Sequence, residues 1–254
     1  MPQFYVPPEN INGDRFFMES GEAHHAFRVL RLKAGATLQI FDGKGGKYLA
    51  RTERTGHKSV AGTIIERLDP LEPELRVTLC FAPVARSSVE DMLSHAAETG
   101  TAAFRPVLTD RTQSDPGKNW SEREKRWRQL LLSACKQCGR AFLPEIFPPQ
   151  SFAEAVSEKN MPGIIAWEKE KKRTICAAMS EVMKKDSRRL RIFVGPEGGL
   201  TDEEAELALE SGIVPFTLGK SIMRTETAGI VASALALADG DLLWGTRSSA
   251  QMAR

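Results

Sequence analysis

The feature that most constrains the fold is an alternation of strand and helix patterns that begins at residue 75. Short apolar runs, typical of buried strands, cover residues 75–81, 104–108, 163–167, 190–194 and 213–218. Segments with the apolar spacing of helices cover residues 88–99, 121–138, 174–185, 202–211 and 227–238. Repeated strand–helix units build a mostly parallel sheet with helices on both faces. We therefore predict an α/β domain for this part of the chain.

Capping boxes support the predicted helix starts. In this motif a serine or threonine before the helix and a glutamate three residues later satisfy each other's backbone N–H groups. Candidate boxes are Ser121 with Glu124, Ser151 with Glu154, and Thr201 with Glu204.

The residues before 70 have a different character. Short β-rich runs occur at 16–18, 37–41, 48–50 and 59–65, and a short helix is expected at 22–31. The glycines of 42–46 supply the positive φ angles of a hairpin. This pattern predicts a small β-barrel. Because prolines interrupt helices and strands, the segment DPLEP at 69–73 predicts a linker and a domain boundary between residues 72 and 73.

Composition narrows the class of protein. The 254 residues are 41% hydrophobic and 27% charged, which is typical of globular proteins and suffices for two domains. The net charge of +2 is too small to indicate a nucleic-acid partner by itself. No apolar stretch reaches the roughly 18 residues that a membrane span needs. The first residues lack a signal-peptide pattern, so the expected location is the cytoplasm.

Several chemistries lack their motifs. The sequence has no G-x-G-x-x-G dinucleotide loop, no phosphate-binding P-loop and no G-x-S-x-G nucleophile elbow. Cys135 and Cys138 form a C-x-x-C pair inside a helical pattern, without a second pair or spaced histidines. We interpret them as small apolar residues, with a metal or redox role as the weaker alternative. No metal site is predicted.

Two loops stand out because ligands of parallel sheets bind beyond the carboxyl ends of the strands. The first loop, 195–199, has the sequence GPEGG and directly follows the strand at 190–194. A strand-to-helix connection needs one glycine, whereas three glycines allow the backbone to approach a ligand closely. The loop is therefore predicted to bind a ligand.

The second loop, 219–226, follows the strand at 213–218 and contains Arg224 and Glu226. The two side chains either form a local ion pair or act on an anionic substrate, one binding it and the other positioning or handling a proton. The next helix is rich in alanine and glycine, which predicts close packing in a buried or intersubunit position.

At these loops the sequence resembles a known family. FVGPEGGLT at 193–201 and LGKSIMRTETA at 218–228 resemble the bacterial 16S ribosomal RNA uridine-N3 methyltransferases of the RsmE type, which belong to the SPOUT class. Further similarity lies at 25–31, at FAPV (81–84) and at 134–140. The resemblance covers nearly the whole chain.

The resemblance implies a PUA-like, RNA-binding β-barrel at 1–72 and a SPOUT methyltransferase domain at 73–254, with a parallel sheet and a C-terminal trefoil knot. It implies a homodimer through the knot region, with no membrane and no metal partner. The implied reaction is methylation of N3 of a specific uridine in 16S ribosomal RNA of the small subunit, with S-adenosylmethionine as the cofactor.

The resemblance also assigns residues by position. The expected cofactor-binding residues are Trp167, Glu168, Gly195, Pro196, Glu197, Gly198, Leu218, Gly219, Ile222, Met223 and Arg224. Arg224 and Glu226 are the expected catalytic residues: Arg224 would stabilise the anionic uracil or its phosphate, and Glu226 would orient Arg224. Arg28, Arg31, Gln137 and Arg140 are expected to bind RNA.

Three positions depart from the family pattern. Ala85 and His95 stand where lysines are usual, and Ser221 stands where arginine is common. These changes remove positive charge near the expected RNA-binding face. Two alternatives follow: a related knotted methyltransferase acting on another base or a ribose 2′-hydroxyl, and a non-catalytic RNA-binding assembly factor.

Overall fold

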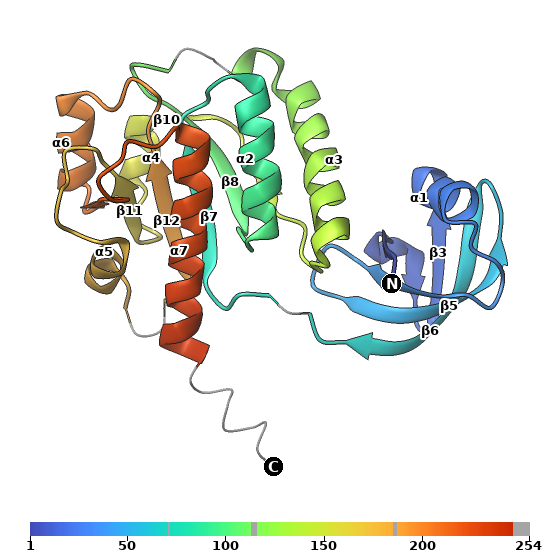
Figure 1. The fold of residues 1–254 in the computed structure, drawn as a ribbon. Coiled ribbons are helices and arrows are strands. Elements are labelled where there is room, and N and C mark those ends of the chain that lie inside the picture. Colours follow the sequence, from blue (N-terminus) through green and yellow to red (C-terminus); the bar gives the residue numbers. More distant parts are fainter. Residues whose placement is uncertain (71, 113–115, 185–186, 246–254) are drawn as a thin grey trace. The chain divides into compact units, whose positions relative to one another are not determined.

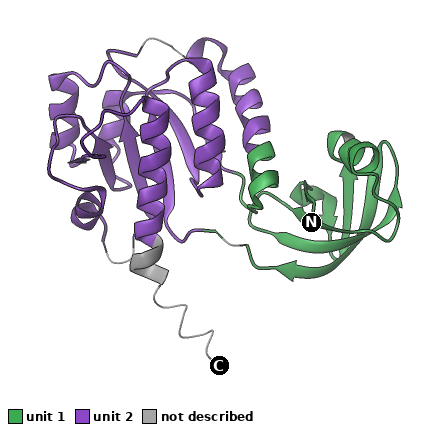
Figure 2. Cartoon of the chain, viewed as in Figure 1, with its two compact units in different colours: residues 1–72, 132–143 green, residues 73–131, 144–254 purple. Residues whose placement is uncertain are grey.

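A computed structural model describes residues 1–70, 72–112, 116–184 and 187–245 (Figure 1). The chain divides into two compact units, coloured separately in Figure 2. The first comprises residues 1–72 and 132–143, and the second comprises residues 73–131 and 144–254. Residues 132–143, which the sequence analysis assigns to the second domain, thus group with the first unit. None of the described helices is both long and apolar enough to cross a bilayer.

The first unit contains a six-stranded sheet in the order β1-β4-β5-β6-β3-β2. Its strands are β1 (Gln3–Tyr5), β2 (Ile11–Asn12), β3 (Arg15–Glu19), β4 (Thr37–Phe41), β5 (Lys47–Thr55) and β6 (Ser59–Leu68). The β1–β4 pair is parallel and the other pairs are antiparallel. Alternate residues such as Phe16 and Met18 point into one core. Register shifts between β5 and β6 bend the sheet around it.

The remaining parts of the first unit follow local sequence signals. Gly43 and Gly45 have positive φ angles between β4 and β5, as the hairpin prediction requires. A 3₁₀ turn, η1 (Pro8–Asn10), precedes β2. The predicted short helix consists of α1 (Ser20–His24) and a π-helical turn, η2 (His25–Val29). Residues 132–143 join this unit because Cys135 and Ala141 pack against Phe41.

The second unit contains a parallel sheet in the order β10-β8-β7-β12-β11-β13, with β9 paired to β8. The strands are β7 (Arg76–Phe81), β8 (Ala103–Leu108), β9 (Glu145–Ile146), β10 (Gln150–Ser151), β11 (Gly163–Ala166), β12 (Arg189–Val194) and β13 (Val214–Phe216). The predicted parallel sheet is confirmed. Because β12 lies between β7 and β11, the chain crosses over before it forms this central strand.

Helices cover both faces of this sheet (Figure 1). They are α2 (Arg86–Glu98), the 3₁₀ turn η3 (Pro116–Asn119), α3 (Trp120–Cys138), α4 (Phe152–Ser157), α5 (Ile175–Val182), α6 (Asp202–Glu210) and α7 (Thr225–Gly245). Cys80 faces a core formed with α4 and α6. Its neighbour Leu79 faces α2 and α7, because successive strand residues point to opposite faces. At Gly229 an added Cβ would lie 2.7 Å from Met92 Sδ, so α7 packs closely, as its small residues predict.

The structure confirms two of the three predicted capping boxes and contradicts the third. Ser151 and Thr201 form complete capping boxes with Glu154 and Glu204. The prediction for Ser121 is wrong: η3 leads directly into α3 at Trp120, so Ser121 already lies inside the first turn. In the C-x-x-C pair Cys135 is buried and Cys138 is exposed. Burial raises the pKa of the Cys135 thiol to about 12, which keeps it protonated at neutral pH.

Candidate functional site

A cavity of about 230 Å³ lies at the carboxyl ends of β11, β12 and β13. Ala166 pairs with both Val194 and Phe216, so the loops that follow these strands emerge side by side. All the predicted cofactor residues except Arg224 line this cavity. Three loops that follow separate strands, at residues 167–171, 195–200 and 217–223, are brought together, because parallel strands end at one edge.

Long-range hydrogen bonds hold the first loop, 195–199. Thr225 Oγ1 donates to the Gly195 carbonyl at 3.0 Å, and Arg111 Nη1 donates to the Gly198 carbonyl at 2.6 Å. The carboxylate of the buried Glu204 accepts from the Thr201 backbone N–H at 2.9 Å and from the Asp110 N–H at 2.8 Å. The loop after β8 thereby braces the cavity wall.

One glycine of this loop is required by geometry. Gly199 alone of the three glycines has a positive φ angle, +70°, which residues with a Cβ rarely adopt. A Cβ there would also lie 2.5 Å from Glu168 Oε1. At Gly195 an added Cβ would meet Leu200 at an ordinary contact distance of 3.4 Å. Gly199, which sequence analysis left out of the cofactor-binding set, therefore fixes the turn.

We expect Gly199→Ala to lower the free energy of unfolding by about 1–2 kcal/mol, the cost of placing an L side chain in the left-handed region. Gly195→Ala is the matched control and should cost less. Urea denaturation followed by circular dichroism measures both. An equal or larger loss for Gly195→Ala would show that backbone conformation does not determine the difference.

The second loop places its charged residues apart from each other. Arg224 is exposed and is not part of the cavity lining, whereas Oε2 of Glu226 is buried and has no protein hydrogen-bond partner. Between these two described residues there is no ion pair. Residues two apart at a helix start do not face each other. The expected orientation of Arg224 by Glu226 is therefore absent from this structure.

The cavity lining contains both apolar and charged side chains. Val194, Leu218, Ile222 and Met223 contribute apolar side chains, and Ile222 is 90% exposed. Charge comes from two acidic and two basic residues: Glu168, Glu197, Lys171 and Lys220. Sequence analysis missed Lys171, which follows β11 and whose Nζ donates to the Glu168 carbonyl at 2.5 Å. It also missed Arg111, because nothing local connects residue 111 with a loop 87 residues away.

The expected RNA-binding residues all lie in the first unit. Arg28, Arg31 and Gln137 are exposed, and Arg28 Nε donates to His57 Nδ1 at 3.3 Å. The structure corrects the expectation that Arg140 is available to RNA. The Arg140 side chain is 6% exposed, and its Nη2 lies 2.8 Å from Glu72 Oε2. A guanidinium that is buried against a carboxylate is not presented to a polyanion, and the loss of either partner would leave an uncompensated buried charge.

The family departures lie at exposed positions. Ala85 precedes α2 without a side-chain cap, and His95 is exposed in the last turn of α2. Ser221 is exposed and lines the cavity. Among the described residues there is no group of three or more histidines, cysteines or acids placed to hold a metal ion.

Comparison with known proteins assigns both parts of the chain. Residues 71–237 match the RNA methyltransferase domain family, and residues 19–65 match the RNA methyltransferase PUA domain family. Ribosomal RNA small subunit methyltransferase E of Synechocystis is 32% identical over 238 residues, covering 90% of this chain and 75% of that protein. The Buchnera aphidicola protein of the same name is 25% identical and covers 91% of each chain.

The fold agrees. Ribosomal RNA small subunit methyltransferase E from Neisseria gonorrhoeae, solved bound to S-adenosyl methionine, matches with a TM-score of 0.81 at 28% identity, covering 96% of this chain and 98% of that one. Sequence and structure thus point to proteins of the same name, and the matches cover 90% or more of this chain. The chain belongs to the RNA methyltransferase family of ribosomal RNA small subunit methyltransferase E.

Proposed function

We propose that this protein methylates N3 of a specific uridine in 16S ribosomal RNA of the small subunit, with S-adenosylmethionine as the methyl donor. The observation that carries the proposal is the cavity formed jointly by loops 195–199 and 218–223, the segments on which the resemblance rests. The similarity to a solved relative bound to S-adenosyl methionine supports the choice of cofactor.

The chemistry of the cavity fits this cofactor. Leu218, Ile222 and Met223 offer an apolar surface for a flat base. Glu168 and Lys171 offer opposite charges that suit the amino and carboxylate groups of an amino-acid moiety. When bound, S-adenosylmethionine supplies an electrophilic methyl group on a sulfonium, which needs no metal.

Methyl transfer makes two demands on the protein. Uracil N3 must lose its proton, and the resulting anion must lie in line with the C–S bond that breaks as the new C–N bond forms. Arg224, exposed beside the cavity, can reach a large substrate and stabilise the anionic uracil or its phosphate. Glu226, on the first turn of α7, is the second proposed catalytic residue.

The first unit is proposed to hold the RNA. Arg28, Arg31 and Gln137 are exposed there and offer contacts to the backbone, which offset the cost of unstacking the target uridine. We further propose the family's C-terminal trefoil knot and a homodimer through the knot region. The family resemblance of residues 193–201 and 218–228 is what supports both proposals.

The test is to map methylated nucleotides in 16S ribosomal RNA from small subunits incubated with and without the protein. N3-methyluridine should appear at one position and stop reverse transcription, because the methyl group blocks base pairing. Fragment masses of the digested nucleoside distinguish a methylated base from a methylated ribose. Methyl on ribose or on another base would replace this proposal with the related-methyltransferase alternative, and no methylation despite RNA binding would favour an assembly factor.

A further inference from the structure

A second cavity, of about 220 Å³, lies at the opposite edge of the same sheet. Its lining includes Arg76, Ala103 and Arg189, the first residues of β7, β8 and β12. The cavity described above lies at the other ends of the parallel strands. The two cavities are therefore separated by the length of the strands.

Strand alternation gathers arginines in this second cavity. On β8, Arg105 lies two residues after Ala103, and on β12, Arg191 lies two residues after Arg189. Residues two apart on a strand point to the same face, so both arginines face this cavity. The segment after α4, from Glu158 to Met161, contributes the rest of the polar wall. In total four arginines and two glutamates line the cavity, an excess of two positive charges.

Arg191 is the least exposed of the four arginines, with 3% of its side chain exposed. Its two terminal nitrogens donate to the carbonyls of Ala155, Glu158 and Met161, the last at 2.7 Å. Its Nε is buried and has no protein acceptor. A buried donor without an acceptor has lost its hydrogen bond to water without replacing it, so an acceptor supplied by a ligand would be favourable there.

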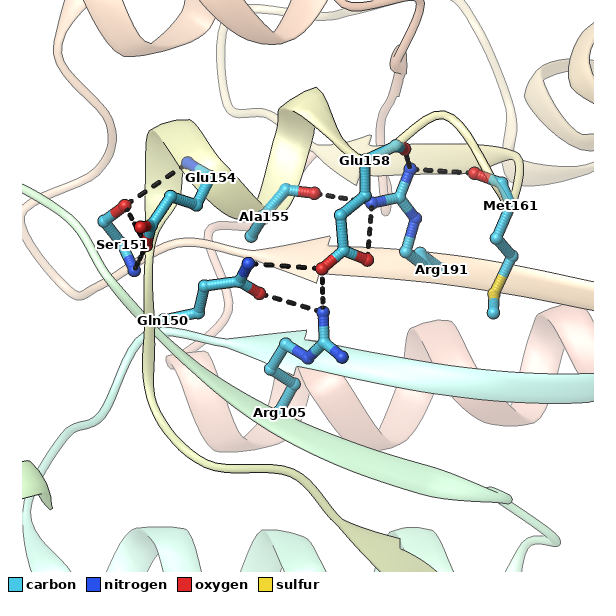
Figure 3. Close-up of polar contacts among 8 residues, drawn as sticks. All are labelled: Arg105, Gln150, Ser151, Glu154, Ala155, Glu158, Met161 and Arg191. Atoms are coloured by element: carbon cyan, nitrogen blue, oxygen red, sulfur yellow. Dashed lines mark hydrogen bonds and ion pairs between the residues drawn. The ribbon is translucent and has the colours of Figure 1, made fainter.

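The buried charges do not cancel. One carboxylate, that of Glu158, serves two guanidiniums: Arg105 at 2.6 Å and Arg191 at 3.8 Å (Figure 3). Gln150 also belongs to this group, because its Oε1 accepts a hydrogen bond from Arg105 Nη1 at 2.9 Å. Burial lowers the pKa of the Arg191 guanidinium, the direction expected when a cation is taken from water. The group retains one uncompensated positive charge, which an anion would neutralise.

We propose that this cavity binds a phosphate group, either inorganic phosphate or the monoester of a mononucleotide. Guanidinium groups match phosphate oxygens in geometry and charge, and a small site whose innermost donor is buried suits a small anion better than a polymer. Phe147 also lines the cavity, with the Arg105 guanidinium 4.5 Å from its ring centroid. This apolar wall could contact the base of a nucleotide.

The experiment is calorimetric titration of the full chain with inorganic phosphate and, separately, with cytidine monophosphate, which lacks the adenine of the proposed cofactor, at constant ionic strength. One saturable site per chain is expected. Tighter binding of the monophosphate identifies a nucleotide as the ligand, and equal or weaker binding identifies free phosphate. Arg189→Gln, at the exposed rim, should weaken binding about tenfold, the effect of losing one charge-assisted contact. Lys159→Gln is the matched control: it removes one exposed charge from the same region, outside the lining, and should leave the affinity unchanged.

A second variant is expected to change the phosphate affinity in the opposite direction. Glu158→Gln removes the carboxylate that competes with the anion and should tighten phosphate binding, provided that circular dichroism shows a folded protein. The proposal is overturned if the wild type shows no saturable phosphate binding at millimolar concentration, or if Arg189→Gln and Lys159→Gln have the same affinity. Binding of a short RNA that Arg189→Gln weakens, in the absence of phosphate binding, would also overturn it, in favour of an RNA contact.

Discussion

Arg224→Ala is expected to lower kcat for methyl transfer to small-subunit particles by about 10²–10³-fold, the typical cost of removing one group that stabilises a developing anion. The affinity for S-adenosylmethionine should change little, because the Arg224 side chain does not line the cavity. Kinetics with radiolabelled methyl donor and calorimetry with the same cofactor separate the two effects. Arg224→Lys keeps the charge without the planar fork and should recover part of the activity.

Lys169→Ala is the matched control for this prediction. Lys169 is an exposed cation that pairs with Asp202 and does not line the cavity. Its loss should leave kcat unchanged. Near-normal methyl transfer by Arg224→Ala would show that Arg224 does not act on the reacting uracil. A loss confined to cofactor affinity would instead return Arg224 to the cofactor-binding set.

Glu72→Ala is expected to destabilise the first unit by about 3–5 kcal/mol, the typical cost of breaking a buried ion pair from one side. The Glu72 carboxylate accepts from Arg140 Nε and Nη2 and from the backbone N–H groups of Ala141 and Phe142. Its removal leaves a buried cation and two backbone donors without this acceptor. Urea denaturation followed by far-ultraviolet circular dichroism measures the loss in the free energy of unfolding.

Glu53→Ala is the control for Glu72→Ala. Glu53 also pairs with an arginine, Arg15, but both side chains are largely exposed, so stability should change little. A similarly small effect for Glu72→Ala would mean that Arg140 finds other partners. In that case the Arg140 side chain could still turn outward toward RNA, as its sequence position suggests.

Much of the second unit follows from local patterns. The strand at 190–194 and the capping box of Thr201 are read from adjacent residues, and the structure contains both. Ser121 shows the limit of such signals, because the turn at 116–119 already starts the helix one residue earlier. A capping motif states only that a helix could begin there, and neighbouring structure decides.

The sequence by itself determined the two-part organisation, the parallel sheet and the two loops that line the cavity, since each depends on periodicity or on glycines within a few residues. Tertiary structure alone decided how those loops are held. Glu204 reaches Asp110 across 94 residues, and Arg111 reaches Gly198 across 87. It also buried Arg140 against Glu72 and joined Arg105 to Glu158, 53 residues apart. Charged residues carry no periodic signal that names a distant partner, so only the folded chain shows which ones meet.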